Sequence, residues 1–186
     1  MGRIVFITGG VRSGKSAFAE YYAKKIFTVY HKKKLVYIAS GVAIDDEMQA
    51  RIKRHQIDRL HSHIVWQTIE VPDVIPKELN QFTEDTVILW DCITTWLSNI
   101  LYKTENSLNR NEAIEQFIRT FQHQLMCWKE QNVSILIVSN EVLDEPKSPY
   151  TEVETYKKCL GELSQWLVAF CDEAYEIDHK QVNRWK

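Results

Sequence analysis

The sequence predicts an α/β fold in which helices cover both faces of a mostly parallel sheet. Short runs rich in β-branched residues alternate along the chain with longer segments of helical spacing. Two of the short runs, 87–90 and 135–138, are continuously apolar, which is typical of strands that are buried on both faces. We therefore expect these two strands to lie at the centre of the sheet.

The individual elements are predicted from the short β-branched runs, which indicate strands, and from the helical spacing of apolar residues, which indicates helices. The expected strands are 3–8, 35–39, 65–70, 87–91, 133–139 and, with the weakest pattern, 174–177. The expected helices, in which apolar residues recur at spacings of three and four, are 15–27, 45–54, 94–102, 109–130 and 153–171. Residues 143–149 contain two prolines and three charges without any periodicity, which predicts a mobile loop rather than a domain linker.

Composition indicates the class of protein. The 186 residues, of which 45% are hydrophobic and 26% charged, fit a single domain spanning residues 1–186 with a sizeable core. No uncharged apolar run approaches the ~18 residues of a membrane-spanning helix, and the first strand is too short for a signal peptide. The four cysteines form no Cys-x-x-Cys pair. We expect a cytoplasmic protein with reduced, structural cysteines.

The charge of the chain is unevenly distributed. The first 60 residues hold 12 Lys and Arg against 5 Asp and Glu, although the whole chain has a formal charge of -2. Such an excess attracts polyphosphate or nucleic acid. Five of the lysines flank the end of an expected helix, however, where cations favour the helix dipole and water, so a solvated face is the preferred interpretation and no nucleic-acid partner is expected. They are Lys24, Lys25, Lys32, Lys33 and Lys34.

The strongest motif is a complete Gly-x-x-x-x-Gly-Lys-Ser pattern between an expected strand and an expected helix. Small residues let such a loop curl until its backbone N–H groups converge with the helix N-terminus on phosphate oxygens. The lysine then neutralises the terminal phosphates, and the serine hydroxyl holds Mg²⁺. A glycine turn with an incidental lysine is disfavoured by this context. The predicted nucleotide-binding residues are Gly9, Gly10, Val11, Arg12, Ser13, Gly14, Lys15 and Ser16.

Acidic and amide side chains follow two of the expected strands. Asp91 ends the buried strand 87–90, at the sheet edge where ligands bind in open α/β folds. It is therefore a candidate ligand, direct or through water, of the same Mg²⁺ ion. Capping of the following helix is the alternative role for this carboxylate. Asn140 and Glu141 come just after the strand 133–139 and are expected to line the same edge.

One histidine lies on the inward face of an expected helix. Met48, Ile52 and His55 are spaced i, i+4 and i+7, which places His55 on the apolar stripe of the helix 45–54. On spacing alone, an interior or capping histidine is favoured over a catalytic one. His61 and His63 have the spacing of a metal pair but lack a nearby carboxylate or thiol, so surface positions are expected for both.

Several motifs together resemble the adenosylcobinamide kinase/adenosylcobinamide-phosphate guanylyltransferase family of cobalamin biosynthesis. The matching segments are the loop 9–16, Tyr37-Ile-Ala, Asp45-Asp-Glu-Met-Gln-Ala-Arg-Ile-Lys-Arg-His55, Leu89-Trp-Asp-Cys-Ile-Thr-Thr95 with Asn99, and Val138-Ser-Asn-Glu-Val142. The run that ends at His55 is the most specific of them. Spacing alone favours an interior or capping role for His55, but the match to this run reverses that preference. The resemblance implies that His55 is a catalytic residue.

The resemblance implies a fold of the P-loop nucleoside triphosphate hydrolase type, often assembled as a homotrimer. It implies an enzyme that phosphorylates the aminopropanol hydroxyl of adenosylcobinamide and then transfers GMP from GTP through a guanylylated histidine. The expected partners are a corrinoid substrate, ATP and GTP, with Mg²⁺ as the cofactor. The resemblance makes His55 a catalytic residue, and the motifs described above add Lys15 as a second catalytic residue and Ser16 and Asp91 as metal ligands.

The family pattern is not continuous to the end of the chain. In the region 143–165, only Gly161 and Gln165 stand at matching places. Two alternatives to the bifunctional transferase therefore remain. One is a P-loop kinase for another small hydroxyl substrate, and the other is a diverged nucleotide-binding regulatory protein.

Overall fold

The computed structural model describes residues 2–41, 64–141 and 148–186. These residues contain a seven-stranded sheet of order β3-β2-β4-β5-β1-β6-β7, in which neighbouring strands are parallel except for the last pair. The strands are β1 (Ile4–Thr8), β2 (Lys34–Ala39), β3 (Gln67–Glu70), β4 (Thr86–Asp91), β5 (Ser134–Val138), β6 (Glu173–Asp178) and β7 (Gln181–Arg184). The expected α/β class with a mostly parallel sheet is confirmed.

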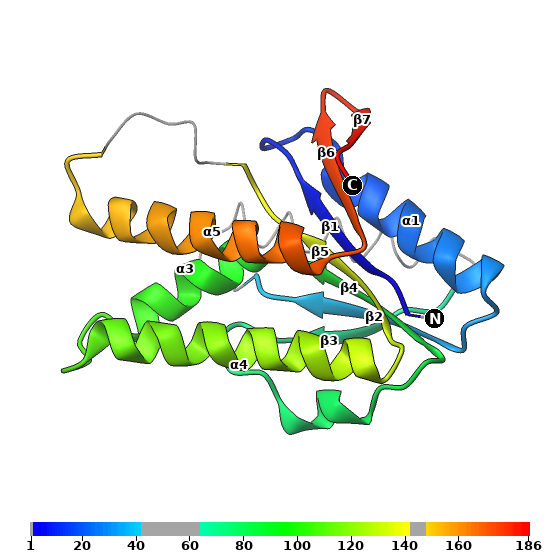
Figure 1. Ribbon diagram of the computed structural model, residues 1–186, viewed down its shortest axis with the longest axis horizontal. Coiled ribbons are helices and arrows are strands. Elements are labelled where there is room, and N and C mark those ends of the chain that lie inside the picture. The colour runs from blue at the N-terminus through cyan, green and yellow to red at the C-terminus, as the bar shows by residue number, and fades with distance from the viewer. Residues whose placement is uncertain (1, 42–63, 142–147) are drawn as a thin grey trace.

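Helices cover both faces of this sheet, as expected (Figure 1). α1 (Lys15–Val29) packs on one face, where its apolar residues meet one set of alternating strand residues, such as Val5 and Ile7. α3 (Ile93–Lys103), α4 (Arg110–Glu130) and α5 (Thr151–Phe170) pack on the other, against the intervening set, such as Ile4 and Phe6. Because successive strand residues point to opposite faces, the sheet contributes side chains to two apolar cores, one on each face.

The two continuously apolar strands lie inside the sheet, as predicted. β4 and β5 pair with each other, and every residue of β5 is buried. The helix expected at 153–171 begins two residues earlier, at Thr151. The helix expected at 45–54 lies outside the described residues, as does most of the loop 143–149. No membrane-crossing helix, by length and apolar character, occurs within the described ranges.

Two elements were not expected from the sequence. η1 (Lys77–Gln81) is a short 3-10 helix, too short to show a helical period. β7 consists of Gln-Val-Asn-Arg, and all four of its residues are exposed. A strand that buries neither face carries no alternation of apolar and polar residues, so β7 left no periodic signal in the sequence.

Three tryptophans, one each on β4, α3 and α4, are fully buried in the core, and each indole N–H donates a hydrogen bond. Trp90 Nε1 donates to Ser40 Oγ at 2.8 Å, Trp96 Nε1 to Asp73 O at 2.7 Å and Trp128 Nε1 to Leu79 O at 3.0 Å. The acceptors lie in the segment just after β2, in the loop after β3 and in η1. Because the rings cannot move without losing these bonds, they hold the three segments against the core.

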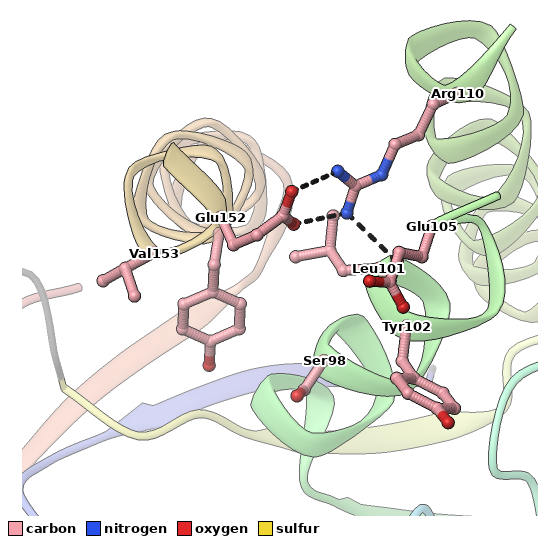
Figure 2. A pocket seen from close by; sticks show the side chains of 8 residues that line it. Ser98, Leu101, Tyr102, Glu105, Arg110, Glu152 and Val153 are labelled. Carbon is pink, nitrogen blue, oxygen red and sulfur yellow. Dashed lines mark hydrogen bonds and ion pairs between the residues drawn. The ribbon is translucent and has the colours of Figure 1, made fainter. Parts of the chain in front are cut away.

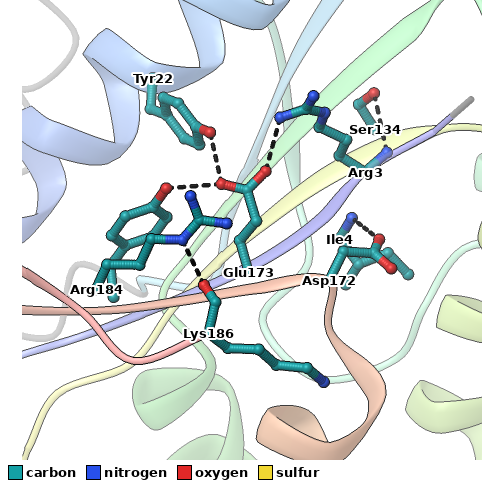
Figure 3. A network of polar contacts seen from close by, with 9 residues as sticks. Arg3, Ile4, Tyr22, Ser134, Asp172, Glu173, Arg184 and Lys186 are labelled. Atoms are coloured by element: carbon teal, nitrogen blue, oxygen red, sulfur yellow. Dashed lines mark hydrogen bonds and ion pairs between the residues drawn. The ribbon is translucent and has the colours of Figure 1, made fainter.

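A cluster of polar side chains lies at the start of β6 (Figure 3). The buried carboxylate of Glu173 accepts hydrogen bonds from the hydroxyls of Tyr22 and Tyr175, both at 2.7 Å, and from Arg3 Nη1 at 2.8 Å. Burial alone would raise the pKa of Glu173, but the hydrogen bonds from Tyr175 and Tyr22 and the charge of Arg3 outweigh it and lower that pKa. This cluster joins α1 to the amino end of the sheet, opposite the edge described next.

Candidate nucleotide site

The loop 9–16, called the phosphate loop below, connects β1 to α1 at the carboxyl edge of the sheet. Its backbone requires glycine at two positions. Gly9 has φ +157°, and a Cβ there would collide with the carbonyl oxygen of Ile177. Gly14 has φ +98° and precedes the first helical residue, Lys15. L-residues rarely adopt such angles, so the glycines of the motif are explained by the path of the chain.

The phosphate loop is tied to both neighbouring strands. Gly9 O accepts a hydrogen bond from the backbone N–H of Glu141, just beyond β5, at 2.9 Å. Ser13 O accepts one from the N–H of Lys180, in the turn after β6, at 2.8 Å. Within the loop, Ser13 N donates to Gly10 O at 3.2 Å. The loop is therefore held in a fixed shape from two sides.

The polar side chains of the loop are partly sheltered. Lys15 is only 4% exposed, and its Nζ donates to Gly10 O at 2.9 Å. The Ser13 hydroxyl is buried and has no hydrogen-bond partner in the described part of the chain. Ser16 is half-buried in the first turn of α1. A buried cation and a buried hydroxyl at a helix N-terminus form a chemically suitable site for phosphate oxygens.

Asp91 reaches the same edge of the sheet from β4, with β5 between it and the strand of the phosphate loop. Its carboxylate is half-buried and takes no hydrogen bond or ion pair among residues 2–41, 64–141 and 148–186. The residue at the start of α3 is Cys92, and no side-chain capping bond occurs there. The helix-cap alternative for Asp91 is therefore wrong, and its oxygens remain accessible to a cation.

Asn140 and Thr94 connect the end of β5 to α3. Asn140 Nδ2 donates to Thr94 Oγ1 at 2.9 Å, and the same hydroxyl lies 2.9 Å from the Sγ of Cys92. Tyr156 of α5 approaches from the other side, with its hydroxyl 3.4 Å from Thr94 O. Burial, and then the proximity of Cys92, raises the pKa of Tyr156 to about 12, so this phenol is a proton donor throughout the neutral range.

A cavity of about 350 Å³ opens beside this cluster, between α3 and the start of α5 (Figure 2). Arg110 closes one side of it, with Nη1 and Nη2 each 2.5 Å from a carboxylate oxygen of Glu152. Nη2 also donates to Leu101 O at the end of α3. Such a paired contact fixes both charged groups in one plane. It joins the first residue of α4 to the first turn of α5.

The structure thus brings some predicted residues together and leaves others aside. The phosphate loop, Asp91, Asn140 and Glu141 share the carboxyl edge, as the strand pattern predicted. His55, His61 and His63 lie outside the described residues. Thr94 and Tyr156 were not identified as contacts of Asn140, because no sequence spacing joins residues from β5, α3 and α5. The approach of Lys180 to the phosphate loop was also missed, since it depends on the unexpected strand β7.

Comparison with known proteins identifies relatives over nearly the whole chain. The model of the cobinamide kinase / cobinamide phosphate guanyltransferase family matches residues 5–179. The bifunctional adenosylcobalamin biosynthesis protein CobU of Escherichia coli is 27% identical over 183 residues, which cover 94% of each chain. CobP of Pseudomonas aeruginosa, which has the same description, is 34% identical over 136 residues, covering 73% of this chain and 69% of its own.

Solved structures agree on the fold. The KaiC-like protein PH0186 of Pyrococcus horikoshii superposes on 100% of this chain and 79% of its own with a TM-score of 0.50 at 11% sequence identity. The flagellar accessory protein FlaH of Methanocaldococcus jannaschii gives a TM-score of 0.50 at 13% identity, with 100% and 78% covered. The architecture is that of P-loop nucleoside triphosphate hydrolases. By fold, motif and family match, the chain belongs to the cobinamide kinase / cobinamide phosphate guanyltransferase family of enzymes.

Proposed function

We propose that this enzyme phosphorylates the hydroxyl of adenosylcobinamide and then transfers GMP from GTP to the resulting phosphate through a guanylylated His55. The observation that carries the proposal is the shared sheet edge. The phosphate loop, with its buried Lys15, lies there in a chain of this family, together with the carboxylate of Asp91, which has no partner within the described ranges. One nucleotide site serves both reactions, because each of them needs a triphosphate held at the same loop.

In the phosphoryl transfer, the loop N–H groups and Lys15 bind the phosphate chain and neutralise its charge. The hydroxyl of Ser16 and the carboxylate of Asp91 are hard oxygen donors suited to Mg²⁺, which commonly binds one or two protein oxygens together with substrate phosphates. When bound, the ion neutralises charge on the transferred phosphoryl group. The oxygen of the acceptor hydroxyl forms a bond to the γ-phosphorus while the bond from that phosphorus to the β,γ-bridging oxygen breaks. The hydroxyl proton passes to solvent, and the nucleoside diphosphate departs.

In the guanylyl transfer, a neutral imidazole nitrogen of His55 attacks the α-phosphorus of GTP. A P–N bond forms while the bond to the bridging oxygen of the β-phosphate breaks, and pyrophosphate departs. An oxygen of adenosylcobinamide phosphate then attacks the same phosphorus, and the P–N bond breaks. Double displacement divides one difficult step into two easier ones. The assignment of His55 rests on the family run Asp45-Asp-Glu-Met-Gln-Ala-Arg-Ile-Lys-Arg-His55, because that segment lies outside the described residues.

We also propose that the enzyme assembles as a homotrimer, as the family resemblance implies. Sedimentation equilibrium of the full chain tests this assembly directly. A chain of 21.9 kDa is expected to sediment with three times that mass, and a single-chain mass at micromolar concentration contradicts the proposal.

The decisive experiment is covalent labelling with GTP that carries radioactive phosphorus at the α-position. Wild-type enzyme should retain label after denaturation, and the adduct should be acid-labile and stable in alkali, as a phosphoramidate is. Labelling should rise with pH through the region near ~6.5, where an unperturbed imidazole loses its proton. His55→Ala should abolish the label, whereas the matched controls His61→Ala and His63→Ala should keep it.

The same experiment separates the competing functions. A His55→Ala enzyme that still phosphorylates adenosylcobinamide supports two steps with separate requirements, because phosphoryl transfer needs no covalent histidine. Folded wild-type protein that binds GTP without taking up label contradicts the guanylylated histidine. In that case, turnover of a different hydroxyl acceptor distinguishes a simple kinase from a nucleotide-binding regulatory protein.

A further inference from the structure

The turn between β6 and β7 is packed against the phosphate loop. The backbone N–H of Lys180 donates to Ser13 O at 2.8 Å. The Cγ of Lys180 lies 3.2 Å from the position that a Cβ would occupy at Gly14, and its Cα lies 3.8 Å from that point. On the other side of the loop, Gly9 leaves no room for a side chain beneath Ile177 O. The end of the hairpin is therefore in direct contact with both glycines of the motif.

The backbone of this turn has an unfavourable conformation for its residues. His179 has φ +47° and Lys180 has φ +66°, both in the left-handed region. Two-residue hairpin turns of this kind favour Asn and Gly, which adopt positive φ at little cost. A histidine and a lysine there lower the stability of the turn relative to glycine. An observed backbone outlier beside a binding loop motivates a search for function in the side chains.

The two side chains of the turn differ in their partners. His179 Nδ1 lies 2.7 Å from Asp178 Oδ1, so the imidazole and the carboxylate contact each other. Lys180 is exposed, and its ammonium makes no hydrogen bond or ion pair with any residue in the described ranges. Its four-carbon stem begins against Gly14, the residue that precedes Lys15 at the N-terminus of α1. A flexible cation is thus anchored at the rim of the phosphate loop.

We propose that Lys180 is a second phosphate-binding cation of the nucleotide site, with the chemical class of its ligand a nucleoside triphosphate. This inference rests on the nucleotide site of the proposed function. Lys15 is buried within the loop, whereas Lys180 lies outside it on a flexible stem, so the two cations approach the phosphate chain from different sides. Lys180 contacts the triphosphate directly through its ammonium, and the hydrogen bond from its own N–H to Ser13 O fixes its Cα beside the loop.

Replacement of Lys180 by glycine separates the side chain from the backbone. Lys180→Gly keeps the N–H that binds Ser13 O and removes the left-handed strain, so the melting temperature should rise. GTP affinity, measured by calorimetry at saturating Mg²⁺, should nevertheless fall by about fivefold, as expected for one partly solvated charge-assisted contact. A residue with only a structural role would not give a more stable protein that binds its ligand less well.

His179→Gly is the matched control. It relieves the same kind of strain one residue earlier and leaves the number of Lys and Arg charges unchanged. Its melting temperature should also rise, but its GTP affinity should stay within a factor of two of wild type. Lys180→Arg should retain most of the affinity, and the loss in Lys180→Gly should be larger for GTP than for GMP, because the contact is to the phosphate chain.

Two results would overturn the inference. One is wild-type GTP affinity in Lys180→Gly, and the other is an equal loss for GTP and GMP. The proposed nucleotide site has a separate test, since Lys15→Ala removes the buried cation of the loop. If Lys15→Ala abolishes GTP binding while Lys180→Gly leaves it unchanged, the nucleotide site stands and the role of Lys180 is wrong. If wild-type protein binds no GTP, the proposed function fails as well.

Discussion

The side-chain amide of Asn140 donates to the hydroxyl of Thr94 at 2.9 Å and so joins the end of β5 to the first turn of α3. β5 is the strand between the phosphate loop strand β1 and the strand that ends at Asp91. Thr94 follows Asp91 by three residues, so the amide fixes the segment that carries the carboxylate. The distance between the two halves of the proposed nucleotide site is therefore held by a side-chain contact as well as by the sheet.

The Asn140–Thr94 contact should be measurable as a coupling free energy. Asn140→Ala and Thr94→Val should each lower the free energy of unfolding, and the double variant should lose about 1 kcal/mol less than the sum of the two, because the hydrogen bond is removed only once. Urea unfolding of the wild type and the three variants completes the cycle. Additive losses would mean that the contact does not contribute to stability.

Removal of the phosphate-loop cation should weaken nucleotide binding. Lys15→Ala should lower GTP affinity by at least about tenfold, since it deletes a buried charge at the proposed site of the phosphates. Lys24→Ala removes a lysine from the same helix, nine residues further on, and should leave GTP affinity unchanged. Calorimetric titration with Mg²⁺ and GTP checks both. Binding by Lys15→Ala within a factor of two of wild type would contradict the phosphate-loop assignment.

Neutralising Asp91 should affect the metal requirement rather than the fold. Asp91→Asn keeps the shape of the side chain and removes its charge, so Mg²⁺-dependent turnover should fall by at least ~10-fold while the unfolding curve stays near that of wild type. Asp85→Asn is the matched control. Asp85 directly precedes β4, at the amino end of that strand, and pairs with Lys33 far from the carboxyl edge. An unchanged Mg²⁺ dependence in Asp91→Asn would exclude Asp91 as a metal-linked residue.

The Glu173 cluster makes a pH-dependent contribution to stability. The folded state lowers the pKa of Glu173, so its contribution is fully present above the unfolded-state pKa of ~4.3 and is lost as pH falls through the folded value. Glu173→Gln should lower the free energy of unfolding by about 2 kcal/mol at pH 7, through loss of charge-assisted hydrogen bonds. The difference from wild type should shrink in acid.

Glu130→Gln provides the control for this pH dependence, because Glu130 is exposed at the end of α4. Its stability should follow the wild-type curve between pH 3 and pH 7. Denaturant unfolding at several pH values measures all three proteins. A constant difference between wild type and Glu173→Gln over that range would show that the carboxylate charge has no stabilising role.

Within the described ranges, periodicity identified the long helices and the buried strands. The apolar runs of β4 and β5 identified central strands because burial on both faces excludes polar residues from them. The phosphate loop was predictable because its glycines and Lys15 lie within eight consecutive residues. Contacts between distant segments were not predictable in this way. The approach of Lys180 to Gly14 depends on a hairpin whose second strand is polar, and the meeting of Tyr156 with Thr94 depends on the packing of α5 against α3.

The exposed strand β7 also has a consequence for association between molecules. An edge strand presents unpaired backbone groups to other chains, and short, polar or charged edges discourage such pairing. β7 is short, antiparallel and largely polar, and it covers β6, whose Ala174, Tyr175 and Ile177 are buried. Without residues 181–184, β6, which alternates acidic residues with buried apolar ones, would itself form this edge of the sheet. We therefore expect loss of β7 to increase pairing between molecules at this edge of the sheet.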